Sequence, residues 1–76
     1  MPDRRVATIA ASVFGVPAAT LGRETALGSL EPWDSLGHLQ LIASIEAELG
    51  VRFRTDRIPE LTTLGLIEDE IDGGQR

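Results

Sequence analysis

The sequence predicts an all-α fold, a small four-helix bundle with three main helices and one short helix. Three segments repeat apolar residues at intervals of three and four residues, which is the spacing of one helix face. Glycine and proline residues separate these segments and mark the connections between them. The chain has 76 residues, of which 42% are hydrophobic, and this suffices for one domain with a small core. We therefore expect a single domain over residues 1–76.

The first helix is predicted over residues 4–14. One face of this segment carries apolar residues at i, i+3, i+4 and i+7, namely Val6, Ile9, Ala10 and Val13. Asp3 is the expected N-cap, because a short polar side chain accepts a hydrogen bond from the first turn. Gly15 is the expected C-cap, and Pro17 prevents the helix from continuing.

Residues 16–34 form a long connection, which we expect to be a packed loop. Its apolar residues are spaced as anchors on the core: Val16, Leu21, Leu27 and Leu30. A loop of this length in a small domain indicates function or a missed element. We expect a short helical turn around Ala18–Leu21.

The second helix is the clearest element. Asp34 or Ser35 is its expected N-cap, and Gly50 ends it. The expected buried stripe, with Leu41 at its margin, comprises Leu36, Leu39, Ile42, Ala43, Ile45 and Leu49. The exposed positions next to Ser35 are then Gly37, His38 and Gln40.

After the second helix the chain adds a short helix and a last long one. Val51 and Phe53 are expected to fill the core. Thr55 or Asp56 is expected to cap a short helix around residues 56–60.

The last helix is expected to start at Thr62 or Thr63. Its inward face comprises Leu64, Ile67, Glu68 and Ile71. Residues 73–76 are expected to form a frayed tail.

Charge and composition exclude several classes of function. The net charge is −5, with +1 in residues 1–30 and −6 in residues 31–76. This distribution opposes nucleic-acid binding, which needs a basic patch, and it favours basic protein partners. The chain has no cysteine, so any thiol chemistry must come from an attached group. No apolar run reaches the roughly 18 residues of a membrane span, and we read no secretion signal, so we expect a cytoplasmic location. We also expect the protein to be a monomer.

Ser35 is the candidate functional residue. Without a comparison to a known family, however, the residues around it also allow other roles for this serine. An Asp34-Ser35 pair before an apolar helix is often only a helix cap, as in a small helical adaptor protein that binds partner helices. His38 lies at i+3 from Ser35, but a hydrolase is rejected because no second histidine, no Gly-x-Ser-x-Gly turn and no oxyanion loop is present. A lone histidine is also no metal site, so His38 is expected at the surface, where partners contact it. Trp33 is expected to pack in the core, and the alternative is a contact surface beside Ser35.

The segment over residues 33–46 resembles the phosphopantetheine-attachment motif of acyl carrier proteins. Asp34-Ser35-Leu36 is followed by apolar residues at the family's positions, then by Glu46 and the apolar Leu49. Leu61-Thr62-Thr63-Leu64 resembles the Ile-Thr-Thr-Val entry into the last helix of the family. The resemblance covers nearly the whole chain, and it implies a discrete acyl carrier with the acyl-carrier-protein fold.

The resemblance also implies roles for individual residues. Ser35 would carry a 4'-phosphopantetheine arm from coenzyme A, whose thiol holds acyl groups as thioesters. Asp34 would serve recognition by the phosphopantetheinyl transferase, and Leu36 would contact partners. Such a carrier is not an enzyme, and its partners are the transferase and the enzymes that load and process acyl groups.

The second helix departs from the pattern of fatty-acid carriers in one respect. Those carriers often place several acidic residues just after Asp-Ser-Leu, whereas here the acids appear later, at Glu46 and Glu48. This departure favours a dedicated carrier in a polyketide, peptide or related biosynthetic pathway.

Overall fold

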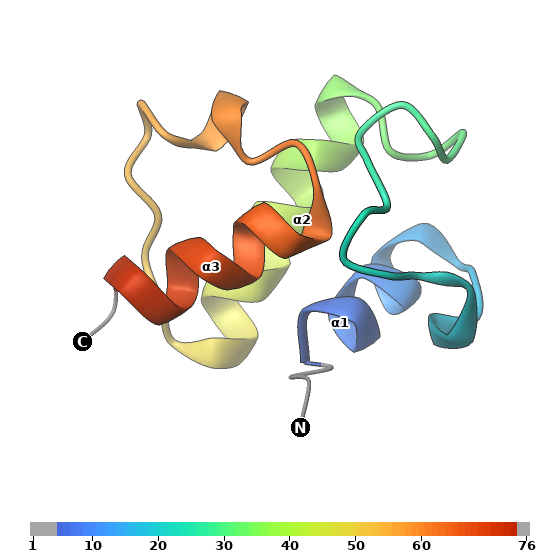
Figure 1. Cartoon of the computed structure of the whole chain (residues 1–76), viewed down its shortest axis with the longest axis horizontal. Coiled ribbons are helices and arrows are strands. Elements are labelled where there is room, and N and C mark those ends of the chain that lie inside the picture. Colours follow the sequence, from blue (N-terminus) through green and yellow to red (C-terminus); the bar gives the residue numbers. More distant parts are fainter. Residues whose placement is uncertain (1–4, 75–76) are drawn as a thin grey trace.

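The computed structural model describes residues 5–74, and its helices confirm the predicted all-α fold (Figure 1). The described part of the chain contains no β-strand. In chain order the helices are α1 (Arg5–Phe14), the short 3₁₀-helix η1 (Ala18–Thr20), α2 (Ser35–Leu49), the 3₁₀-helix η2 (Ile58–Glu60) and α3 (Leu64–Gly74).

Helix α1 ends as predicted. Gly15 adopts a left-handed φ of +69°, and its N–H donates to the Ala11 carbonyl at 2.9 Å. The expected cap Asp3 lies outside the described residues. The buried face comprises Val6, Ala7, Ile9, Ala10 and Phe14. Val13, expected on this face, is only partly buried, because Phe14 takes the last inward position.

The ends of α2 confirm the predicted bounds. Asp34 is the N-cap, since its Oδ1 accepts from the Gly37 N–H at 2.8 Å. Ser35 is therefore the first helical residue and not the cap. Gly50 ends the helix with a φ of +67°, and its N–H donates to the Glu46 carbonyl.

The buried face of α2 differs from the predicted stripe. Leu36 is 65% exposed and Leu39 is 57% exposed, and Ala43 is also exposed. Ile42 and Ile45 are buried as predicted, and the other buried residues are Gly37, His38 and Leu41. This set also has helical spacing, but it includes a polar residue, so a search for apolar residues alone selected the neighbouring stripe.

The loop over residues 15–34 is packed as predicted, with one exception. Leu21 is buried, while Val16 and Leu30 lie partly buried against the core. Leu27 was expected as an anchor, but its side chain is 36% exposed. The predicted helical turn is present as η1.

This loop is hydrogen-bonded to the start of α3. The Leu27 N–H donates to the Thr62 carbonyl at 2.8 Å, and the Gly65 N–H donates to the Arg23 carbonyl at 2.9 Å. The Arg23 guanidinium pairs with Glu68 at 2.8 Å and with Asp69 at 3.0 Å. The hydrogen bond from Arg23 to Asp69 and the negative charge of the Asp69 carboxylate raise the pKa of Arg23.

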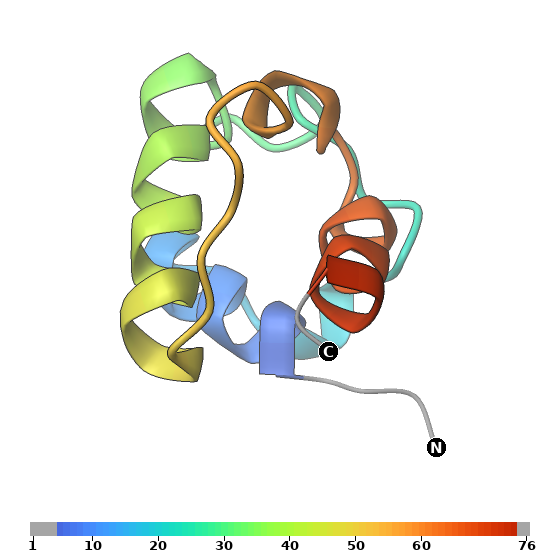
Figure 2. The same ribbon diagram turned by 90° about the vertical axis from the view of Figure 1, so that its left-hand side faces the viewer.

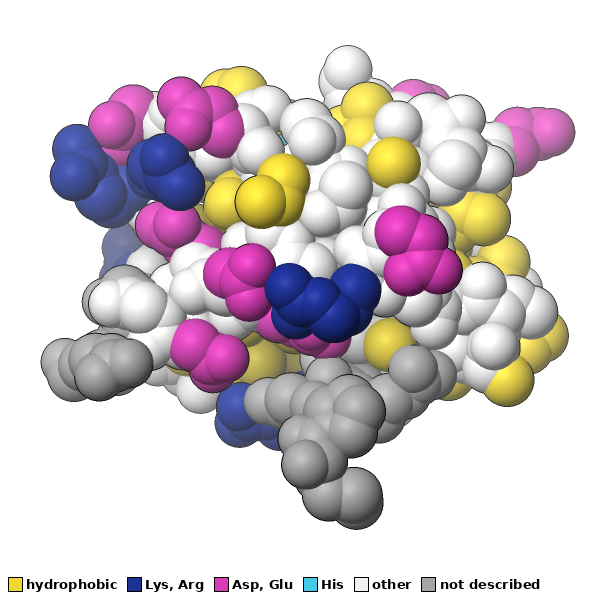
Figure 3. Space-filling model, in the orientation of Figure 1, with side chains coloured by type: hydrophobic (Ala, Val, Ile, Leu, Met, Phe, Trp, Pro, Cys, Tyr) yellow, Lys and Arg dark blue, Asp and Glu magenta, His cyan; other side chains and the backbone are white. Residues whose placement is uncertain are grey.

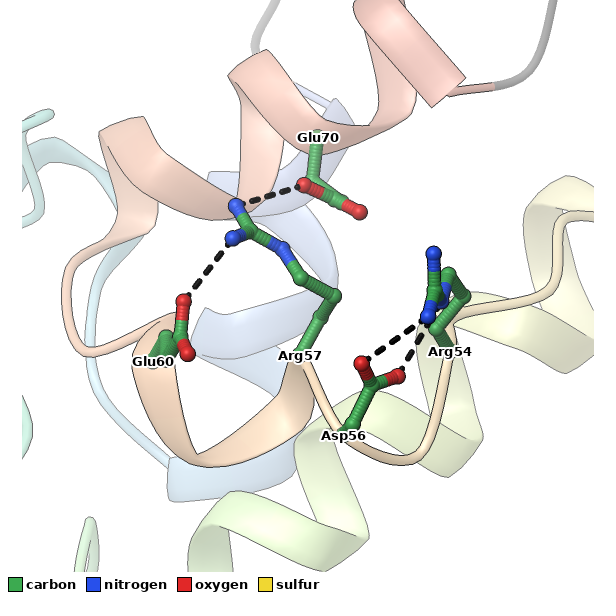
Figure 4. A network of polar contacts seen from close by, with 5 residues as sticks. All are labelled: Arg54, Asp56, Arg57, Glu60 and Glu70. Atoms are coloured by element: carbon green, nitrogen blue, oxygen red, sulfur yellow. Dashed lines mark hydrogen bonds and ion pairs between the residues drawn. The ribbon is translucent and has the colours of Figure 1, made fainter.

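The connection between α2 and α3 is held by core contacts and by ion pairs. Val51 and Phe53 are buried, as predicted. Arg57 bridges η2 and α3, because it pairs with Glu60 at 2.8 Å and with Glu70 at 3.2 Å (Figure 4). The expected capping role of Thr55 or Asp56 is wrong: no side chain caps η2, and Asp56 pairs with Arg54 at 3.0 Å.

Helix α3 starts behind Thr63, whose Oγ1 accepts from the Leu66 N–H at 3.1 Å. Leu64, Ile67 and Ile71 are buried, as the spacing predicted. The frayed tail expected from residue 73 is wrong for residues 73 and 74, which continue the helix. Residues 75 and 76 lie outside the described part.

The helices place the start of α2 and η2 together at one end of the molecule (Figures 1 and 2). The start of α1 and the end of α3 lie toward the other end. On the face that carries α3, basic side chains at the upper left and in the centre lie among acidic ones and form no continuous basic surface (Figure 3). Within residues 5–74, no helix has the length and apolar character needed to cross a membrane.

Candidate attachment site

Ser35 occupies the first helical position of α2, and its side chain is exposed. Because Asp34 provides the cap, the Ser35 hydroxyl is not needed to start the helix. A phosphodiester on this oxygen would lie at the positive end of the helix dipole, next to N–H groups of the first turn. The position therefore suits a covalently attached phosphate ester.

A shallow groove of about 340 Å³ begins beside Ser35. It is mostly apolar, and it lies between the first turns of α2, the loop before it and η2. The residues that line it are Leu27, Ser35, His38, Leu39, Ile58, Pro59 and Thr62. The exposed Leu27 and Leu39, both expected in the core, therefore form part of this surface.

His38 is buried, which corrects the expectation that it lies at the surface. Its side chain is 5% exposed. The Trp33 indole N–H donates to Nδ1 at 3.0 Å, and Nε2 lies 2.8 Å from the Ile58 carbonyl oxygen. An indole can only donate and a carbonyl can only accept, so the neutral imidazole with its proton on Nε2 satisfies both partners.

These hydrogen bonds also exclude a Ser35–His38 hydrolase. The Nδ1 lone pair already accepts from Trp33, and the Nε2 proton is donated to Ile58. Neither nitrogen is left to take a proton from the Ser35 hydroxyl, which a general base must do. Within the described residues no cluster of His, Cys, Asp or Glu could hold a metal ion either.

Gly37 is a structural residue of the site that sequence reasoning placed on the exposed surface. It is buried, and a side chain there would collide with the carbonyl group of Pro32. Trp33, fully buried at 0% exposure, follows Pro32 directly, so its predicted packing role is confirmed. The close approach of Pro32 to α2 is a tertiary contact, and no local signal in the sequence indicates it.

Comparisons with known proteins agree with this geometry. Residues 4–71 match the protein family described as "Phosphopantetheine attachment site". Nine chains of solved structures match significantly. One is the solution NMR structure of a holo acyl carrier protein from Geobacter metallireducens, with a TM-score of 0.82 and 31% sequence identity, covering 96% of this chain and 85% of that chain. A comparison with curated proteins gives no significant match.

The chain therefore belongs to the phosphopantetheine-attachment family. Fold and family together define it as an acyl carrier protein, which is a carrier and not an enzyme. Its cofactor is covalently attached 4'-phosphopantetheine, as the resemblance implied. The family match decides against the adaptor alternative. Its premise that Ser35 serves as a helix cap is also wrong, because Asp34 is the cap.

Proposed function

We propose that Ser35 is the residue that carries the phosphopantetheine arm. The observation that supports this most is its exposed hydroxyl at the first position of α2, beside the groove and free of the capping role. When bound, the arm supplies a thiol that holds acyl groups as thioesters. The chain's part is to provide the Ser35 oxygen for the phosphodiester and a helix end that stabilises its negative charge.

The surroundings of two other serines, Ser29 and Ser44, support this choice. The Ser29 Oγ is engaged in a tight turn, where it donates to the Ala26 carbonyl at 2.5 Å. Ser44 is half-buried in the middle of α2. Neither lies at the start of a long helix.

The first prediction is that Ser35→Ala abolishes modification. Incubation with coenzyme A and a phosphopantetheinyl transferase should add one phosphopantetheine to the wild type, as measured by intact mass. Ser29→Ala and Ser44→Ala are the matched controls and should be modified as the wild type is. A mass shift that persists in Ser35→Ala would assign the arm to another residue.

Asp34 is proposed to help the transferase recognise the site. The Asp34 carboxylate is exposed although its Oδ1 accepts a hydrogen bond from the Gly37 N–H, so a partner can reach it. Asp34→Asn keeps an oxygen that can cap the helix but removes the charge. In the same assay this variant separates recognition from folding, because it should be modified more slowly while its melting temperature changes little.

We also propose that the carrier serves a dedicated pathway, of the polyketide, peptide or a related type. From Ser35 to Ile45 the sequence of α2 contains no acidic residue, and the exposed side chains next to Ser35 include Leu36 and Leu39. Apart from Asp34, basic patches on partner enzymes find no complementary charge along this part of α2, and Leu36 offers an apolar contact instead. The proposed partners are the transferase and the enzymes that load and process acyl groups. We further propose that the protein is a single domain, that it is a monomer, and that it meets these partners in the cytoplasm.

The second prediction concerns partner choice. The arm-bearing wild type should be a poor substrate for a fatty-acid malonyl transferase. Gln40→Glu with Ala43→Glu places two acids on the exposed face of α2, so it should raise the acylation rate through faster encounter. The neutral pair Gln40→Ser with Ala43→Ser is the control and should have no such effect. A wild-type rate equal to that of a fatty-acid carrier would contradict the proposed specialised pathway.

A further inference from the structure

Three aromatic rings lie stacked in a row in the interior behind the groove. Phe14, at the end of α1, stacks on Trp33 with ring centroids 5.6 Å apart and planes inclined by 28°. Trp33 in turn stacks on His38, with centroids 6.1 Å apart and planes inclined by 23°. The rings therefore follow one another from α1 to His38, whose side chain lines the groove.

The last ring is also fastened to the opposite wall of the groove. Nε2 of His38 lies 2.8 Å from the carbonyl oxygen of Ile58 in η2, and Ile58 lines the groove as well. This hydrogen bond links α2 to η2. The start of α2, which Ser35 forms, and η2 lie at the same end of the molecule (Figures 1 and 2). The His38 ring and this bond therefore form a wall of the groove, with the buried Trp33 behind it.

Two further observations indicate that this wall is stable. Trp33 Nε1 donates to His38 Nδ1, so both ring nitrogens are engaged and the imidazole is held in one orientation. None of the buried polar side-chain atoms in the described part of the chain lacks a hydrogen-bond partner. Moving His38 aside would leave the Trp33 N–H buried without an acceptor, which is unfavourable.

We propose that His38, held between Trp33 and Ile58, closes the interior of the bundle to an acyl group carried on Ser35. Such a group lies in the surface groove against Leu39 and Ile58, where solvent and enzymes reach the thioester. The groove covers one side of a short acyl group, and a longer chain extends beyond it into solvent. This inference rests on the proposed attachment at Ser35 and adds how the cargo is held.

The test uses the carrier loaded from octanoyl-coenzyme A by a phosphopantetheinyl transferase. Hydroxylamine attacks the thioester carbonyl and releases octanoyl hydroxamate and the free thiol of the arm. The wild-type thioester should be cleaved within about twofold of the rate for octanoyl-coenzyme A, because no opening of the fold is needed. If the octanoyl chain were buried in the core, cleavage would be slowed by about tenfold or more. That slower rate would overturn the proposal.

Two variants test whether His38 is the barrier. His38→Ala removes the ring and the Ile58 hydrogen bond, so the octanoyl group should enter the opened space and its cleavage should become several-fold slower. Gln40→Ala, on the exposed face of the same helix, is the matched control and should be cleaved as the wild type is. A folded His38→Ala protein with an unchanged rate would show that another residue closes the interior.

A second measurement does not depend on the variant's folding. Amide shifts of the octanoyl-loaded wild type, compared with the protein that bears only the arm, should change at Leu39 and Thr62 beside the groove. Changes at the core residues Ile45 and Ile67 would place the chain inside the bundle and overturn the proposal. Intact mass distinguishes the two proposals: loss of modification at Ser35 contradicts the attachment site, whereas correct loading with slow cleavage contradicts only the closure by His38.

Discussion

Gly37→Ala is expected to destabilise the protein by about 1–3 kcal/mol, the usual cost of overpacking a filled site. Helix propensity alone predicts the opposite sign, since alanine is favoured over glycine by about 0.8–1 kcal/mol inside a helix. The added methyl group would collide with the carbonyl oxygen of Pro32, and its Cβ would lie 3.2 Å from the carbonyl carbon. Both are backbone atoms, and Pro32 is tied to the fully buried Trp33, so the collision cannot be relieved cheaply.

The measurement is chemical unfolding followed by circular dichroism, with Gly73→Ala as the matched control. Gly73 also lies in a helix, α3, but a Cβ there would meet no atom within 4 Å. The control should therefore gain up to about 1 kcal/mol, in line with propensity. Equal gains in both variants would mean that Pro32 does not pack over the first turn of α2. The same contact rules out a glutamate at Gly37 as a way to make this face of the carrier acidic.

The ends of the helices were predictable because the capping signals are local. Gly15, Gly50 and Thr63 act where the sequence indicated, since a left-handed glycine or a threonine oxygen serves the adjacent turn and needs no distant partner. Ser35 was singled out in the same local way, through the motif it shares with the family, and its role as the attachment residue stays a prediction. Local capping signals therefore carry most of the helix ends that the sequence alone predicted correctly.

The face of α2 that is buried was not predictable in the same way. Ile42 and Ile45 can share a buried face either with Leu36 and Leu39 or with Leu41, so the apolar pattern permits two rotations of the helix about its axis. The structure selects the second, because His38 finds an acceptor and a donor that lie 20 and 5 residues away in the chain. A polar residue whose partners are distant in sequence is assigned to the surface by any rule based on hydrophobicity.

The groove beside Ser35 follows from this rotation. With His38 turned inward, Leu39 lies at the surface and lines the groove together with Leu27 and Pro59. Two leucines that appear to be core residues in the sequence thus form the surface next to Ser35, the proposed attachment site. The surface that an acyl group or a partner enzyme would contact therefore depends on tertiary contacts, which the sequence alone does not indicate.

A comparison of Ile45→Ala with Leu39→Ala tests the rotation of α2 directly. Ile45 is fully buried, so its truncation should cost about 2–5 kcal/mol of the free energy of unfolding. Leu39 is mostly exposed, and Leu39→Ala should change this free energy by less than about 0.5 kcal/mol. At roughly 0.05–0.15 kcal/mol per residue, the whole domain is stabilised by only about 4–11 kcal/mol.

Ile45→Ala is therefore expected to lower the melting temperature strongly or to unfold much of the protein, whereas Leu39→Ala should melt as the wild type does. Both variants remove a large aliphatic side chain from the same helix, so helix propensity changes little between them and burial accounts for the difference. Equal losses would mean that α2 buries the stripe of Leu36 and Leu39 after all. His38 would then face solvent, and both the groove and the closed wall behind it would be absent.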